Sequence, residues 1–232
     1  MEQFQIKPLT EPRKVEWEHD TLPIPEFRLI IVAPSAAGKS TALSNIISSH
    51  KFPYRDYFGE NIFIVSPTLK LGSMDGVDNI KQSNIFDTFN VDVLQEIIEE
   101  QTSLIERFPK KVVPYLLVFD DVVADLDKNQ KAFLRRCFFG LRHTRGSIII
   151  LSQFYRALPK SVRSNATDTM FFEIANSKER QDIAEENSFP TQQFLDVLDY
   201  ATSIQPFSFL LVRHRKPKNQ RLQLRFTNNI LS

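Results

Sequence analysis

Short, uninterrupted apolar segments alternate along the chain with longer stretches in which apolar residues recur every three or four positions. Continuous apolar runs are typical of parallel strands buried on both faces, and the helical spacing is typical of crossover helices. The pattern therefore predicts an α/β fold with a mostly parallel central sheet flanked by helices. Strands are expected at 27–33, 61–66, 115–120, 147–152 and 169–174.

Helical periodicity and capping residues place the helices between these strands. Asp125 or Asp127 can cap the helix that precedes the fourth strand. The segments 207–213 and 221–226 read as a terminal β-hairpin. Helices are expected at 39–49, about 91–108, from the aspartate cap to about Arg142, and at about 191–202.

The remaining segments define the domain organisation. Residues 1–26 are polar and rich in proline, which predicts an irregular lead-in or an edge strand anchored by Trp17. Residues 67–90 contain many Gly, Asp and Asn residues and are expected to form an exposed loop. We expect a single domain over 27–232, because no internal repeat or second domain is visible.

The sequence APSAAGKST follows the first apolar run without a break. A buried strand that turns through small residues into Gly-Lys-Ser and a helix is typical of a phosphate-binding loop. Lys39 is expected to reach the β- and γ-phosphates of ATP, and the Ser40 hydroxyl to bind Mg²⁺. Ala33 replaces the usual first glycine, which is tolerable at negative φ, and Pro34 removes one N–H donor. The nucleotide-binding candidates are Ala33, Pro34, Ser35, Ala36, Ala37, Gly38, Lys39, Ser40 and Thr41.

A second part of the site follows the third apolar run, in PYLLVFDDVV. Two carboxylates at the end of a buried parallel strand lie at the carboxyl edge of the sheet, where ligands bind. We assign Asp120 to Mg²⁺ and Asp121 to the attacking water. Two acids that merely cap a strand are the simpler explanation for this segment alone, and the phosphate-binding loop argues against it.

The fourth strand ends in Gln153, and an arginine-bearing turn precedes it. An amide can donate to a phosphate oxygen and accept from water, which suits a sensor of the γ-phosphate. Arg142 and Arg145 are candidates for a catalytic arginine that reaches a neighbouring subunit's ATP. Positive charges near a helix end also compensate the helix dipole without further function.

Composition and charge indicate the class of protein and its cellular compartment. The chain has 232 residues, 42% hydrophobic content and a formal net charge of +1, as expected of a globular protein without a uniformly basic coat. No apolar run approaches the roughly 20 residues of a membrane span, and the N-terminus has no signal-peptide core. Cys137 is the only cysteine and lies among apolar residues at helical spacing. These features predict a protein of a reducing, intracellular compartment without membrane partners.

Together these motifs resemble the FtsK–HerA superfamily of DNA-pumping ATPases, and more closely the poxvirus-type genome-packaging ATPases of large DNA viruses and virophages. The matching segments are APSAAGKST, IFIVSPT, LLVFDD and GLRHTRGSIIILSQFYRALPKSVRSNATDTMFF, within residues 27–187. In that family an arginine precedes the fourth strand, a glutamine ends it, and an Arg-x-Asn segment leads into the fifth. Arg142, Gln153, and Arg163 with Asn165 match those positions.

The resemblance implies a RecA-like P-loop NTPase that hydrolyses ATP with Mg²⁺ and assembles into a ring, a pentamer or hexamer. Such a ring moves double-stranded DNA into a preformed capsid, in contact with capsid or vertex proteins, inside the infected cell or in the virion. Three alternatives stay open: a segregation or helicase-like motor, an ATP-binding assembly switch without sustained translocation, and a small-molecule kinase.

Basic residues crowd the terminal hairpin, and such clusters bind DNA phosphates without base contacts. A solvated hairpin tip or a protein interface explains them equally well. The DNA-binding candidates are Arg213, Arg215, Lys216, Lys218 and Arg221, with Arg225 beside them and Lys70 and Lys81 as weaker candidates in the loop.

Overall fold

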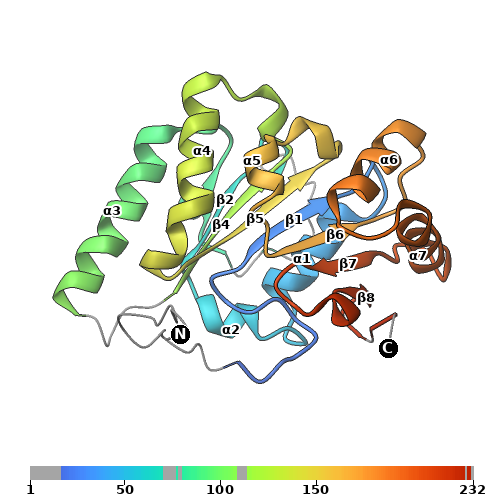
Figure 1. Cartoon of the computed structure of the whole chain (residues 1–232). Helices are drawn as coiled ribbons and strands as arrows, with labels where there is room; N and C mark the ends of the chain where they lie inside the picture. Colours follow the sequence, from blue (N-terminus) through green and yellow to red (C-terminus); the bar gives the residue numbers. More distant parts are fainter. Residues whose placement is uncertain (1–16, 70–76, 78–79, 109–113, 228, 231–232) are drawn as a thin grey trace, which may run out of the picture.

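The computed structural model describes residues 17–69, 77, 80–108, 114–227 and 229–230. Its centre is an eight-stranded sheet in the order β3-β2-β4-β5-β1-β6-β7-β8, shown in Figure 1. The strands are β1 (Arg28–Val32), β2 (Ile62–Val65), β3 (Ile85–Phe86), β4 (Tyr115–Asp120), β5 (Gly146–Ser152), β6 (Asp168–Phe171), β7 (Leu210–Arg213) and β8 (Leu222–Leu224).

Six of the strands run parallel, and the last two form an antiparallel extension of the sheet. β5 lies between β4 and β1, so that Asp120 pairs with Leu151 and Val32 pairs with Ser152. β7 pairs antiparallel with β6, and β8 pairs antiparallel with β7. The carboxyl ends of β1, β2, β4 and β5 therefore meet at one edge of the sheet, where α/β proteins bind ligands.

Helices cover both faces of the sheet (Figure 1). One apolar cluster holds α1 and α2, and the other holds α3 to α7. The helices are α1 (Lys39–Ser48), α2 (Tyr54–Phe58), α3 (Val91–Arg107), α4 (Lys128–Gly140), α5 (Lys160–Arg163), α6 (Ser177–Glu186) and α7 (Thr191–Ser203). Short 3₁₀ turns occur at Gln82–Asn84 (η2), Val123–Asp125 (η3), Leu141–Thr144 (η4), Tyr155–Ala157 (η5) and Lys218–Gln220 (η6).

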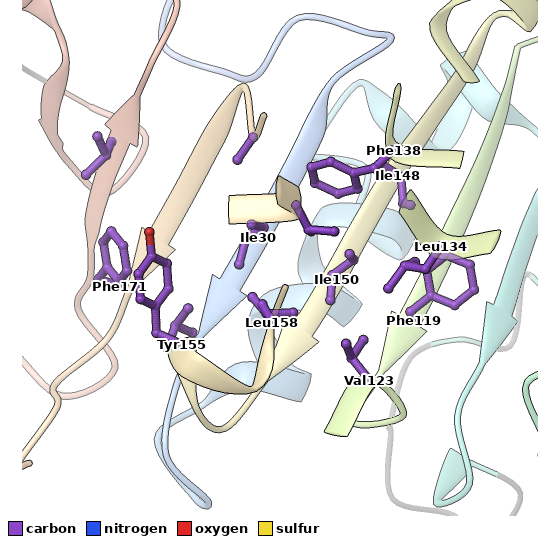
Figure 2. Packing of buried hydrophobic residues seen from close by; sticks show 14 of the residues in the cluster. Ile30, Phe119, Val123, Leu134, Phe138, Ile148, Ile150, Tyr155, Leu158 and Phe171 are labelled. Carbon is purple, nitrogen blue, oxygen red and sulfur yellow. The ribbon is translucent and has the colours of Figure 1, made fainter. Parts of the chain in front are cut away.

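Apolar residues of the central strands alternate between the two clusters. Ile30 belongs to the α3–α7 side, whereas Leu29 and Ile31 belong to the α1–α2 side. Figure 2 shows Ile148 and Ile150 of β5 next to side chains from α4. Burial on both faces explains the continuous apolar runs in the sequence.

The five predicted strands, the four predicted helices and the hairpin are all present, with boundaries shifted by a few residues. Asp127, rather than Asp125, caps α4 in a capping box with Gln130. The helix ends at Gly140, before the predicted Arg142, and η4 continues the chain to Thr144. Trp17 stacks on Tyr54 at a ring-centroid distance of 5.2 Å, which confirms it as an anchor.

Several expectations need correction. The described part of 67–90 is not wholly a loop, because it includes η2 and the short strand β3. Lys81 pairs with Glu60 there at 2.6 Å, and Lys70 lies outside the described residues, as does most of the lead-in 1–26. The helices α2, α5 and α6 were not predicted from the sequence. Among the described helices, none is long and apolar enough to cross a membrane.

Candidate active site

The predicted phosphate-binding loop joins the carboxyl end of β1 to the start of α1. Ala33 extends the β1 ladder, since its N–H donates to the Ser152 carbonyl at 3.1 Å. The chain then turns with positive φ at Ala36 and at Gly38, which is the N-cap of α1. The first turn of α1 contains no acidic residue. The free N–H groups and positive dipole end of α1 therefore favour an anion at this position.

A cavity of about 340 Å³ opens over this loop. Two of the nucleotide-binding candidates do not line it: Ala33 is fully buried in the sheet, and Ala37 faces a neighbouring cavity. The assignment of Ala33 to nucleotide binding is therefore corrected, because the strand ladder uses its N–H. The lining residues are Pro34, Ser35, Ala36, Gly38, Lys39, Ser40, Thr41, Asp121, Gln153 and Phe207.

Lys39 is the central cation of this cavity. The Lys39 side chain is buried, and its ammonium group forms a short ion pair with Asp121 Oδ2. Gln153 Nε2 donates to the same carboxylate oxygen at 3.1 Å. Three predicted catalytic residues from three different elements thus meet at one point. The Asp121 carboxylate thus neutralises the charge of the buried Lys39 ammonium group.

Asp120, the last residue of β4, is the candidate magnesium ligand. Ser66 Oγ donates to Asp120 Oδ2 at 2.9 Å, whereas Oδ1 is buried without a hydrogen-bond partner among the described residues. Burial raises the pKa of Asp120, and the hydrogen bond from Ser66 and the charge of Lys39 oppose that rise. A buried carboxylate oxygen without a partner, together with the Ser40 hydroxyl of the loop, fits the oxygen ligands that Mg²⁺ prefers.

Ser66 and Phe207 belong to this site, and neither was predicted from the sequence. Ser66 is the polar residue that follows an apolar strand, which is the same signal that identified Asp120 and Gln153. Phe207 follows α7 and has no local signal, since it reaches the loop only through the tertiary fold. It lies so close to Gly38 that a Cβ atom added there would be 2.7 Å from Phe207 Cδ1.

Arg142 and Arg145 lie away from this cavity, in the turn before β5. Because β5 has seven residues, its two ends are about 20 Å apart. The Tyr115 hydroxyl and Thr144 Oγ1 are 2.7 Å apart, and Tyr115 leaves no room for a side chain at Gly146. The turn is therefore held firmly, and the exposed Arg142 is far from its own chain's phosphate site.

At the amino edge of the sheet, the positive charge of Arg142 acts on two other arginines, Arg28 and Arg215. Burial, and then the charges of Arg215 and Arg142, lower the pKa of the half-buried Arg28 to about 10. Burial and Arg142 also lower the pKa of Arg215, against the opposing effect of Asp168. Arg28 Nε is buried and has no hydrogen-bond partner among the described residues. Such a concentration of positive charge favours a bound anion.

The structure removes Arg213 from the DNA-binding candidates. Arg213 is only 3% exposed, pairs with Asp168 at 3.2 Å and donates to the carbonyls of Asp20 and Leu22. It pairs with Asp168 across β6 and β7, so the fold buries this cation for structural reasons. The other candidates lie between β7 and β8. Arg215 and Lys218 are exposed there, and Lys216 and Arg221 are half-buried.

Replacing Arg213 with alanine is expected to lower the free energy of unfolding by about 3–5 kcal/mol, because Asp168 would remain buried without its partner. Urea titration followed by circular dichroism measures this change. Lys178→Ala, at an exposed position, serves as the matched control and is expected to change stability by less than about 0.5 kcal/mol. Equal effects of the two substitutions would contradict a structural role for Arg213.

The Arg-x-Asn segment also has structural contacts. Arg163 forms hydrogen bonds with both oxygens of Glu186, at 2.9 and 2.6 Å, and stacks over the Tyr155 ring. Asn165 Nδ2 donates to the Ser161 carbonyl at 2.9 Å. These contacts fix the chain that enters β6, which gives Arg163 and Asn165 a structural role there. Arg142 and Arg145 stay the predicted candidates for an arginine acting on another subunit.

Comparison with known proteins tests the resemblance found in the sequence. The family described as Poxvirus A32 protein matches residues 14–203. The DNA packaging protein OPG160 of Variola virus is 30% identical over 156 residues, covering 65% of this chain and 54% of that protein. OPG160 of Monkeypox virus is also 30% identical, and the match covers 49% of its length. This chain thus spans about half the length of the relatives that it matches.

Solved structures show the same fold at low sequence identity. The genome packaging NTPase B204 of Sulfolobus turreted icosahedral virus 2, in complex with AMPPCP, superimposes with a TM-score of 0.62 at 16% identity, covering 87% of this chain and 97% of B204. The cytoplasmic domain of the type VII secretion ATPase EccC of Thermomonospora curvata superimposes with a TM-score of 0.57 at 13% identity, covering 86% of this chain and 24% of EccC. The fold is therefore that of the genome packaging NTPase B204 and of the ATPase EccC. The match over residues 14–203 shows that this chain belongs to the Poxvirus A32 family.

Proposed function

We propose that this protein hydrolyses ATP to drive double-stranded DNA into a viral capsid, as a ring of identical subunits. The observation that carries the proposal is the meeting of Lys39, Asp121 and Gln153 in the cavity at the start of α1. The family relationship supports packaging as the purpose, since the relatives are DNA packaging proteins. The B204 complex supports an adenine nucleotide as the ligand of this fold.

The geometry suggests how the site would act on ATP. The γ-phosphate competes with Asp121 for Lys39, so nucleotide binding releases the Asp121 carboxylate. Asp121 then accepts a hydrogen bond from the attacking water, while the Gln153 amide contacts the water or a phosphate oxygen. Water attacks the γ-phosphorus as the bond between that phosphorus and the bridging oxygen breaks. ADP leaves with that oxygen and its electron pair, and a proton of the water passes through Asp121 to the released phosphate. Ser40 and Asp120 would hold Mg²⁺, which neutralises charge on the phosphates.

The position of Arg142 supports action between subunits. Its turn lies about one strand length from its own phosphate site, so Arg142 could reach only the ATP of another copy. A guanidinium delivered to the γ-phosphate by a neighbour stabilises charge in the transition state. Arg145, in the same turn, is the second candidate. Head-to-tail contacts between identical subunits generate a closed ring when the rotation closes.

Double-stranded DNA is expected to stimulate ATP hydrolysis if the protein is a motor. The test measures steady-state phosphate release with and without long duplex DNA, at several protein concentrations. An assembly switch would bind ATP with no stimulated turnover, and a small-molecule kinase would be insensitive to DNA. Either result would contradict the proposed function.

The same preparations test where DNA binds. Replacing Arg215, Lys216 and Lys218 together with alanine is expected to weaken duplex binding without changing sequence preference, because these residues would contact phosphates. The slope of log affinity against log salt becomes shallower by about 0.9 for each phosphate that the protein no longer neutralises. The control replaces Lys51, Lys128 and Lys178, which are exposed on other elements. An unchanged slope would show that the hairpin tip does not contact DNA.

A further inference from the structure

Phe207 has a strained backbone and an exposed ring at the phosphate-binding loop. Its φ is 61°, a left-handed conformation that bulky residues rarely adopt, and 65% of its surface is exposed. The ring nevertheless lies against Gly38, the N-cap of α1. Strain of this kind persists where the surrounding structure enforces it, frequently at ligand-binding sites. Phe207 is thus placed to contact a ligand of the loop.

A second cavity, of about 460 Å³, lies directly beside the phosphate site. Gly38, Thr41 and Phe207 line both cavities, so the two spaces adjoin. We call this second space the base cavity. Its volume is within the range of small-molecule sites. It is lined by Gly38, Thr41, Ala42, Asn45, Phe52, Phe172, Gln205, Pro206, Phe207, Phe209, Arg225, Phe226 and Thr227.

One face of α1 leads from the phosphates into the base cavity. Gly38, Thr41, Ala42 and Asn45 are spaced by three, four and seven positions, which places them on the same side of the helix. This face extends for about 10 Å along the helix axis. A nucleoside triphosphate with its phosphates at Lys39 is long enough to follow it.

Five of the residues that line the base cavity are aromatic: Phe52, Phe172, Phe207, Phe209 and Phe226. Phe52 and Phe209 each pack edge-on against Phe226, at centroid distances of 5.5 and 5.2 Å. With Phe207 at the mouth, these rings offer flat apolar surface to a planar group. Aromatic rings stack on nucleobases of any sequence, because every base has a π face.

Arg225 adds an unsatisfied polar group to this aromatic lining. Its Nε is buried and has no hydrogen-bond partner among the residues that the structure describes. Its backbone is fixed by a hydrogen bond from its N–H to the Phe209 carbonyl at 3.1 Å. A buried donor without a partner is costly, so a ligand that brings an acceptor gains from binding here.

We propose that the base cavity holds the nucleobase and ribose of the nucleotide whose phosphates bind at Lys39. Phe207 stacks on the base and closes the cavity, and Arg225 donates to an acceptor on the base or ribose. The inference rests on the proposed nucleotide site and extends it to recognition of the nucleoside. Continuity with the phosphate cavity favours this occupant over a peptide or a DNA base.

The test compares ATP with inorganic tripolyphosphate, which has the phosphates and lacks the nucleoside. Dissociation constants of both ligands are measured by titration calorimetry with Mg²⁺. Phe207→Ala is expected to weaken ATP binding by roughly 5- to 150-fold, which is the affinity usually lost when an aromatic ring stacked on one base is removed. Tripolyphosphate binding is expected to stay within about twofold. Phe207→Trp retains a stacking surface and is expected to retain ATP affinity.

Two further variants separate the base cavity from the phosphate site. Arg225→Gln is expected to weaken the binding of ATP and leave the binding of tripolyphosphate unchanged. Lys39→Ala is expected to weaken the binding of both ligands. Phe139→Ala, which removes an exposed ring of α4, is the matched control and is expected to change neither.

The outcomes distinguish failure of the two proposals. If Phe207→Ala weakens the binding of both ligands equally, or the binding of neither, the base cavity does not bind the nucleoside. If the unmodified protein binds ATP no better than tripolyphosphate, the base cavity is again rejected, whereas the phosphate site stands. If it binds neither ligand, both proposals fail.

Discussion

Replacing Lys39 with alanine is expected to lower kcat for ATP hydrolysis by at least about 10²–10³-fold, the usual loss when one donor to a developing negative charge is removed. Lys39 is buried beside Asp121, and it is the one lysine among the described residues that line the cavity. The substitution also removes the positive charge that opposes the rise in the pKa of Asp120. Steady-state phosphate release with saturating ATP and Mg²⁺ measures the effect.

Two controls belong with this experiment. Lys51→Ala removes an exposed lysine just beyond α1 and is expected to retain normal activity. Far-UV circular dichroism of the Lys39→Ala protein shows whether the fold is intact. Retained hydrolysis in a folded Lys39→Ala protein would contradict the assignment of the phosphate-binding loop.

Arg142→Ala is expected to lower turnover by about 10³–10⁵-fold, the range measured for arginine fingers. The residue is exposed in a turn that Tyr115 and Thr144 hold in place, so its loss removes a guanidinium without disturbing the core. Nucleotide affinity is expected to change little, because the side chain is distant from its own chain's cavity. Arg135→Ala, on the exposed side of α4, is the matched control.

Mixing two inactive proteins tests whether Arg142 acts on another subunit. In rings that combine Arg142→Ala and Lys39→Ala subunits, some interfaces pair an intact Arg142 with an intact Lys39. Partial recovery of activity is therefore expected, and activity rises steeply with protein concentration. Absence of recovery in rings shown to be mixed, or full activity of Arg142→Ala alone, would exclude Arg142 and direct attention to Arg145.

The chemistry at the sheet edge was predictable because it follows a local rule. Parallel strands end at one edge, so the polar residues that directly follow apolar runs must converge there. Asp121 and Gln153 obey this rule, whereas Lys39 was identified by the loop motif after β1, and the three side chains do meet. Ser66 obeys it as well, and the same reasoning could have placed it beside Asp120.

The environments of Arg213 and Phe207 could not be predicted from the sequence. Arg213 belongs to a run of basic residues, and only its pairing with Asp168 on β6 shows that it is buried. Phe207 reaches Gly38 through the chain path after α7, which no local pattern records. In each case the deciding contact joins residues that are far apart in sequence.

The elements that were not predicted lack periodicity for identifiable reasons. α2 has only five residues, and β3 has two, so neither repeats a pattern. α6 is mostly polar and buries only Glu179, Ile183 and Ala184, which gives it a narrow apolar stripe. Its position is fixed by tertiary contacts such as the paired hydrogen bonds from Arg180 to Asp199, at 2.6 and 2.7 Å.

The two outermost strands of the sheet are unusually short. β3 has two residues and β8 has three, and the bridge between Gln223 and Asn229 further covers the β8 side. An open sheet can recruit strands from other molecules through unpaired backbone groups at its edges, which leads to aggregation. These edges leave little backbone available for such pairing. In the proposed ring, the described edges would therefore leave contacts between copies to side chains on helices and turns, so that ordered contacts form without uncontrolled strand addition.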